Sequence, residues 1–220
     1  MSGIVGSYFN TRGSGVVAKL GTDGQVFTSS GAGVSQDFEA AAGGGAWNHL
    51  VTTTASGDSE IEFDTTYFTS SYKVYKILIS NLHCSDAGPG TELYCQFKHG
   101  GSYVTSGYSF AAFRIIQTST SAYNGAASDG SASQIQCTGD NLGGDTGETS
   151  CWEMTLDDPL GTDNDKVLWG MAGSVNHDNR HSRETFIGGS ELSTAIDAIK
   201  FYMEGGDFSS GRFSVYGITT

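Results

Sequence analysis

The sequence predicts an all-β protein: an antiparallel, jelly-roll-like β-sandwich preceded by an extended, glycine-rich N-terminal segment. Short runs that alternate apolar and polar residues recur along most of the chain, as they do in strands with one buried face. Loops rich in glycine, aspartate and serine separate these runs. Glycine supplies 32 of the 220 residues and proline only 2, and no amphipathic helix longer than about ten residues can be drawn. This combination is typical of sandwiches and jelly rolls.

Residues 1–45 differ from the rest of the chain because they hold too few large apolar residues to form a core alone. Asp23-Gly24 lies between short apolar runs at residues 16–20 and 25–28, which predicts a hairpin. An Ala/Gly linker at residues 40–45 predicts the boundary between an N-terminal anchor or shaft (1–45) and a head domain (46–220). The side chains that we expect to attach the anchor to its partner are Val16, Val17, Leu20, Val26, Phe27 and Phe38.

The head domain contains a series of about nine to eleven predicted strands. They fall at residues 59–63, 72–81, 93–97, 108–118, 134–138, 151–156, 166–175, 185–187, 196–203 and 212–218. The breakers between them are residues 86–90, 99–102, 124–130, 139–147, 157–164 and 205–211.

In the first of these runs the larger apolar residues are two apart, on one face of a strand. Residues 59–63 alternate strictly, and Tyr75, Ile77 and Ile79 share one face of the next run. One stretch is ambiguous. Within residues 190–200 a helical turn or two fits the spacing, and a strand from Ala195 fits nearly as well.

The chain is strongly acidic, with 11 Lys and Arg against 24 Asp and Glu and a net charge of −13. Most of this excess falls in residues 46–220. Phosphate-backbone and anionic-membrane binding need clustered basic residues, so we expect neither nucleic acid nor a membrane surface as a partner. No run approaches the 18 or so apolar residues of a membrane span. The first residues lack the basic and apolar regions of a signal peptide, so we expect folding in a cytosol.

Four cysteines, Cys84, Cys95, Cys137 and Cys151, lie in or beside predicted strands without C-x-x-C spacing. Buried free thiols are the main interpretation. Two local disulfides, Cys84–Cys95 and Cys137–Cys151, are the alternative because each pair flanks one loop. A zinc site is the third reading.

No constellation in the sequence predicts an enzyme. His177 and His181 have the spacing of a zinc-binding helix but stand in a polar loop. The start of a calcium loop at residues 163–165 lacks the glycine required at its sixth position. No Gly-x-Ser-x-Gly and no phosphate-binding loop occur, so we assign no catalytic residue, cofactor or metal. Looser calcium sites remain an alternative to solvated turns at Asp157, Asp158, Asp163 and Asp165, and at Asp140, Asp145 and Glu148.

Three tyrosines are candidates for contact with another molecule. Tyr103, Tyr108 and Tyr123 lie in or near predicted loops among serines and glycines. Tyrosine, serine and glycine together form adaptable contact surfaces, and flat rings can stack on sugars. The alternative is that these rings cap the core of the sandwich.

Two stretches resemble parts of a known family. Residues 21–34, followed by Phe38-Glu39-Ala40 and the linker, resemble a connecting segment of tailed-bacteriophage fibre and appendage proteins. Residues 199–218 are similar to the last two strands and the connecting turn of the β-sandwich head of such proteins. The resemblance implies a virion protein, a homotrimer with an N-terminal anchor and a C-terminal sandwich head. These motifs are structural signatures and carry no functional residues.

We therefore expect a trimeric tail-fibre or tail-tip appendage that is assembled in the host cytoplasm and resides in the virion. Its N-terminal segment would bind other virion proteins, and its head would contact a host surface glycan or protein. Because only about forty residues precede the head, a capsid decoration protein (cement or head fibre) is the alternative. A lectin or carbohydrate-active enzyme of non-viral origin is the third hypothesis.

Overall fold

The computed structural model describes residues 25–28, 37–40, 46–86, 91–117 and 122–219. The chain divides into two units, Met1–Gly45 and Ala46–Thr220, and each is described by itself. Within the described residues the secondary structure is entirely β-strand, and no helix is long and apolar enough to cross a membrane.

In the N-terminal unit, β1 (Gln25–Thr28) pairs antiparallel with β2 (Asp37–Ala40), so that Phe27 lies opposite Phe38. The strand predicted at residues 25–28 is therefore present. Its described partner is β2 rather than residues 16–20. The Asp23-Gly24 turn and the predicted attachment residues Val16, Val17 and Leu20 lie outside the described residues.

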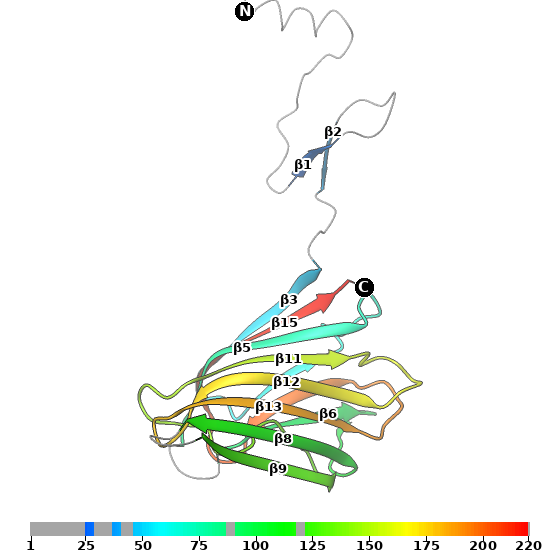
Figure 1. Ribbon diagram of the computed structural model, residues 1–220. Helices are drawn as coiled ribbons and strands as arrows, with labels where there is room; N and C mark the ends of the chain where they lie inside the picture. Colours follow the sequence, from blue (N-terminus) through cyan, green and yellow to red (C-terminus); the bar gives the residue numbers. More distant parts are fainter. Residues whose placement is uncertain (1–24, 29–36, 41–45, 87–90, 118–121, 220) are drawn as a thin grey trace, which may run out of the picture. The chain divides into compact units, whose positions relative to one another are not determined.

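The head is an antiparallel β-sandwich, as the sequence predicts, with sheets of unequal size (Figure 1). The larger sheet has eight strands. Their order across the sheet is β3 (Trp47–Ala55), β15 (Phe208–Ile218), β5 (Val74–Cys84), β11 (Ser150–Asp157), β12 (Lys166–Val175), β13 (His181–Ser190), β8 (Tyr108–Gln117) and β9 (Ala122–Ala132).

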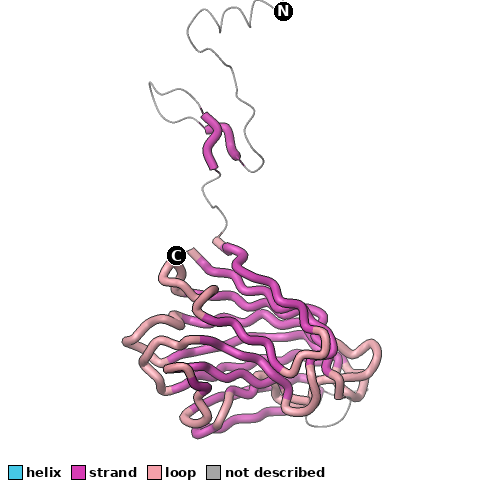
Figure 2. Tube along the Cα trace, turned by 180° about the vertical axis from the view of Figure 1, so that it is seen from behind, coloured by secondary structure: helices cyan, strands magenta, loops and turns pink. Residues whose placement is uncertain are grey.

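The smaller sheet lies behind the larger one in Figure 1, where its strand β6 is labelled. Its strand order is β10 (Ile135–Gln136), β6 (Leu93–His99), β14 (Ala198–Met203) and β4 (Glu60–Asp64), and β7 (Ser102–Tyr103) pairs with β6. The view from behind shows strands and connecting loops throughout the described head (Figure 2).

The core lies between the two sheets because the alternating strands turn their larger apolar residues inward. In β5, Tyr75, Ile77 and Ile79 are buried while the residues between them are half-exposed. Aromatic contacts join the layers. The rings of Phe201 in β14 and Phe213 in β15 have centroids 6.2 Å apart.

Several strands depart from the sequence prediction. β7 was not predicted, and β15 begins at Phe208, four residues before its predicted start and inside a stretch expected to be a breaker. β3 was not predicted because threonine supplies three of its nine residues. β9 occupies the stretch at residues 124–130 that was expected to be a breaker, since its alanines, serines and glycines resemble a loop. β13 begins at His181, four residues before the predicted start, because its first inward positions are the polar Ser182 and Glu184. The helical alternative at residues 190–200 is wrong, because β14 begins at Ala198 and the described chain before it forms no helix.

All four cysteines are free thiols, and neither disulfide forms. Cys84, Cys95 and Cys137 are buried, as expected, and burial raises the pKa of the Cys84 thiol to about 11. Cys151 departs from the expectation because it is exposed on the outer face of β11.

Native thiol labelling is therefore expected to modify one cysteine rapidly, because only a thiolate that solvent can reach reacts. Labelling with Ellman's reagent should release about one equivalent of thiolate before unfolding and about four equivalents in denaturant. The variant Cys151→Ser should lose the rapid equivalent. Rapid labelling that persists in Cys151→Ser would place the reactive thiol elsewhere.

Candidate functional site

The outer face of the larger sheet carries an exposed group of large apolar side chains. We call this group the apolar strip: Phe113 and Ile115 in β8, Trp169 and Met171 in β12, and Ile187 in β13, each between 38 % and 54 % exposed. Solvent-facing positions of an antiparallel sheet are ordinarily polar. The strip is therefore the most unusual surface of the described head.

The strand register makes the apolar strip continuous. Trp169 lies opposite Ile187, and Thr185 lies between Met171 and Phe113 across the three strands. Side chains on one face of adjacent strands have Cβ atoms about 5 Å apart, so these residues touch or nearly touch their neighbours. The strip thus crosses β12, β13 and β8, which all have a neighbouring strand on both sides.

The exposed area of the strip is large enough to matter. A whole aromatic side chain covers about 150–250 Å², so five side chains exposed at 38–54 % present on the order of 400 Å² of apolar surface. The largest apolar patch of an ordinary monomer is about 300–600 Å² and often functional. This comparison favours an interaction surface.

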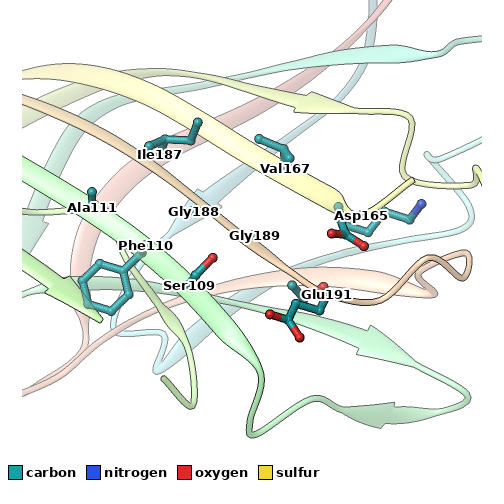
Figure 3. A pocket seen from close by; sticks show the side chains of 11 residues that line it. Ser109, Phe110, Ala111, Asp165, Val167, Ile187, Gly188, Gly189 and Glu191 are labelled. Carbon is teal, nitrogen blue, oxygen red and sulfur yellow. The ribbon is translucent and has the colours of Figure 1, made fainter. Parts of the chain in front are cut away.

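A shallow groove of about 370 Å³ adjoins the strip where β12, β13 and β8 lie side by side (Figure 3). Ile187 and Val167 form its apolar part, and the carboxylates of Asp165 and Glu191 lie together at the other end. Gly189 is required in the floor, because a Cβ atom there would lie 2.2 Å from the carbonyl oxygen of Lys166. The groove therefore offers negative charge beside an apolar surface.

A buried ion pair lies on the inner face beneath the strip. Arg114 in β8 and Glu184 in β13 are directly opposite in register, and Arg114 Nε donates to Glu184 Oε1 at 2.5 Å. Both side chains are fully buried. Arg114 also pairs with Asp140 at 3.0 Å and donates to the carbonyl of Asn141. Burial raises the pKa of Glu184, and the nearby Arg114 opposes that rise.

This network fixes the two strands that carry three of the five residues of the strip. Phe113 and Ile115 flank Arg114 along β8, while the backbone N–H of Gly139 donates to Glu184 Oε2 at 3.0 Å. The loop after β10 is thereby tied to the sheet. The consequence is a fixed register between β8 and β13, and hence a fixed arrangement of Phe113, Ile115 and Ile187 outside.

The outer face of the smaller sheet has a different character. The Tyr103 ring has two ammonium groups near it, with Lys98 Nζ at 5.4 Å and Lys200 Nζ at 4.1 Å from its centroid. Its hydroxyl donates to Glu62, and Lys200 pairs with Glu60 at 2.8 Å. Burial and the bond to Glu62 raise the pKa of Tyr103. The charges on this face are therefore largely satisfied by one another.

The three predicted contact tyrosines do not come together. Tyr103 is half-buried in the smaller sheet, whereas Tyr123 is in β9, at the edge of the larger sheet, with its side chain outside the described residues. The prediction for Tyr108 is wrong. Tyr108 is fully buried, and its hydroxyl bonds with the backbone N–H of Phe97 at 2.7 Å, so the ring belongs to the core.

Two carboxylic acids lie near one another at one end of the smaller sheet. Glu92 directly precedes β6, Glu204 directly follows β14, and the backbone N–H of Glu204 donates to the carbonyl oxygen of Glu92 at 3.0 Å. Burial, followed by the bond to Glu204 and its negative charge, raises the pKa of Glu92 to about 7 from 4.5.

This carboxyl pair predicts a pH dependence of stability. The folded protein holds the proton of Glu92 more tightly than the unfolded chain, so its contribution is complete below about pH 4.5 and is lost as the pH rises through about 7. The variant Glu92→Gln should be less sensitive to pH in this window, by up to about 1 kcal/mol because the group is partly exposed.

The measurement is urea denaturation between pH 4.5 and 8, comparing wild type with Glu92→Gln. Asp163→Asn is a matched control because it removes one exposed acid from a loop. Parallel pH profiles for wild type and Glu92→Gln would show that Glu92 carries no tightly held proton.

The predicted metal-binding loops gain no support from the geometry. Within the described part of the chain, no three His, Cys, Asp or Glu side chains are grouped so that they could hold a metal ion. Asp158 instead pairs with Lys73 at 3.0 Å, and Asp140 pairs with Arg114. Glu148 accepts from the backbone N–H of Asp145 at 2.7 Å. These acids therefore form contacts that stabilise the loops.

The chain matches no protein-family model, and no curated protein or solved structure is significantly similar to it. Functional inference therefore depends on the sequence resemblance and on the surfaces described above.

Proposed function

We propose that the protein is a bacteriophage virion structural protein, a homotrimeric tail-fibre or tail-tip appendage. Its N-terminal unit, including Val26, Phe27 and Phe38, attaches to other virion proteins, and its head contacts a glycan or protein of the host surface. Support comes from the resemblance of residues 21–34 and 199–218 to appendage proteins, and from the separate N-terminal unit that precedes a sandwich head.

The apolar strip is the observation that carries the structural role. β8 has apolar residues on both faces, which is the pattern of a strand covered on both sides. The inner face of β8 is covered by the smaller sheet and the loop after β10, while Phe113 and Ile115 remain exposed in a single chain. This second apolar face is explained if the protein assembles with copies of itself or with other virion proteins.

Host contact is assigned to residues that do not belong to the strip. Tyr103 in the smaller sheet and Tyr123 at the β9 edge remain the candidate receptor-contact residues, whereas Tyr108 is a core residue. No catalytic group, cofactor or metal enters this proposal.

Capsid decoration is the second candidate function. The separate N-terminal unit that favours a tail appendage fits this function as well, because such a unit can bind a capsid shell in place of a tail.

The attachment role is tested by expressing tagged full-length chain and tagged residues 46–220 during infection and purifying the particles. The full-length chain should copurify with the particles, and the head alone should remain in the unbound fraction. Equal incorporation of both would remove the attachment role from residues 1–45.

A further inference from the structure

The two ends of the outer face along β13 carry opposite charges. Arg183 is exposed at one end, beside Met171 and Ile115. Asp165 and Glu191 are exposed at the other end, in the groove of Figure 3. Ile187 is four residues from both Arg183 and Glu191, so the charges are separated by about 26 Å of strand with the apolar strip between them.

None of these three charged groups has an ion-pair partner within the described residues. Glu153, the acid nearest Arg183 on the sheet face, is paired with Lys76 at 2.6 Å. At the groove, the Lys166 ammonium donates to the carbonyls of Gly161 and Asn164. Each end of the strip therefore carries charge that has no ion-pair partner in the described part of the chain.

Arg183 and Arg212 are the two described arginines without an ion-pair partner among the described residues, although acids outnumber bases by 24 to 11 in the chain, and Arg183 is the one that adjoins the strip. Copies with a net charge of −13 repel one another through most of their surface. The outer face of β12, β13 and β8 is the exception, since it carries apolar residues with a positive charge at one end and negative charges at the other. Its charge pattern is complementary to itself when one copy's basic end meets another copy's acidic end.

We propose that this face is the interface between copies of the chain, in which Arg183 of one copy pairs with Asp165 and Glu191 of the next. The proposal rests on the self-association included in the proposed function. In a closed ring of three, head-to-tail contacts join unlike ends, and Ile187 of each copy lies near the axis.

The area of the strip fits this role. A stable interface buries about 800 Å² per partner, with an apolar centre and a polar rim. The strip supplies on the order of 400 Å² of apolar centre, and Arg183, Thr185, Asp165 and Glu191 supply polar groups around it. An interface of ordinary size therefore fits on this face.

The test measures the mass and dissociation constant of the full-length chain by sedimentation. We expect wild type to have the mass of three 23.1 kDa chains. Arg183→Glu alone and the Asp165→Lys/Glu191→Lys pair alone should each weaken association at least about tenfold, because each juxtaposes like charges. Combining the three substitutions should restore the wild-type constant.

Arg212→Glu is the matched control, because Arg212 is an exposed arginine in β15 of the same sheet, four strands away from β13. Arg212→Glu should leave the dissociation constant unchanged. Every variant should have the circular dichroism spectrum of wild type and, at concentrations where the chains are monomeric, the melting temperature of wild type. If the charge reversals leave the dissociation constant of the oligomer unchanged, or if combining them does not restore it, this interface is wrong. The proposed function would still stand. A wild-type chain that stays monomeric contradicts both.

Discussion

Replacing Arg114 with methionine is expected to lower the free energy of unfolding by about 3–5 kcal/mol. The variant leaves the fully buried carboxyl group of Glu184 without its partner, and it releases Asp140 and the Asn141 carbonyl from the same guanidinium. Removing one member of a buried ion pair is costly because the remaining charge stays desolvated. Urea denaturation with linear extrapolation measures the loss.

The double variant Arg114→Met/Glu184→Leu separates loss of the pair from loss of packing. It removes both buried charges, so it should be more stable than Arg114→Met despite carrying one more substitution. Arg114→Lys keeps the charge but not the forked guanidinium, and an intermediate loss is expected. A loss below about 1 kcal/mol for Arg114→Met would contradict a stabilising role for the network.

Truncation of Phe213 to alanine is the second large effect, with an expected loss of about 3–5 kcal/mol. Phe213 is fully buried in β15, and its ring lies 5.2 Å from that of Phe208 and 6.2 Å from that of Phe201 in the opposite sheet. The variant leaves a cavity where the two layers meet. Thermal and urea unfolding both report the change.

Phe113→Ala is the matched control, because the same side chain is removed from the opposite face of the same sheet. Phe113 is 38 % exposed, so the loss should stay below about 1 kcal/mol. The measurement is made at low protein concentration, where association does not contribute to stability. Equal losses for Phe113→Ala and Phe213→Ala would mean that the strip serves the fold of the single chain.

The fold class was predictable because the alternation of apolar and polar residues along a strand shows which positions are buried. β5 and β11 place large apolar residues two apart on the buried face, and each appears close to its predicted bounds. β9 carried no such signal. Its alanines, serines and glycines become a strand through pairing with β8, which is a tertiary effect that a single segment does not encode.

The apolar strip was harder to predict from the sequence. Phe113, Ile115 and Ile187 look like core residues, and only the position of the smaller sheet shows which face they occupy. One signal was available: apolar residues at both parities of β8. The Arg114–Glu184 pair had a similar signal, since each is a charged residue at an inward position of an otherwise alternating strand.

Tyr108 is the opposite case: the sequence predicts a contact residue near a loop, and the structure places it in the core. A tyrosine beside Gly107 resembles a loop residue, yet its hydroxyl finds the backbone of Phe97 inside the sandwich. A buried tyrosine needs such a partner, and the sequence alone did not show that β6 would supply it.

Quantitative mass spectrometry of virus particles purified from the source of the sequence tests the proposed virion role most directly. The account predicts that the protein is a component of the particle, present in about a dozen copies or a similar small multiple of three, as befits a tail appendage built from trimers. Hundreds of copies would move it to the capsid as a decoration protein. Its absence from particles that are otherwise complete would contradict the proposal that it is a virion protein.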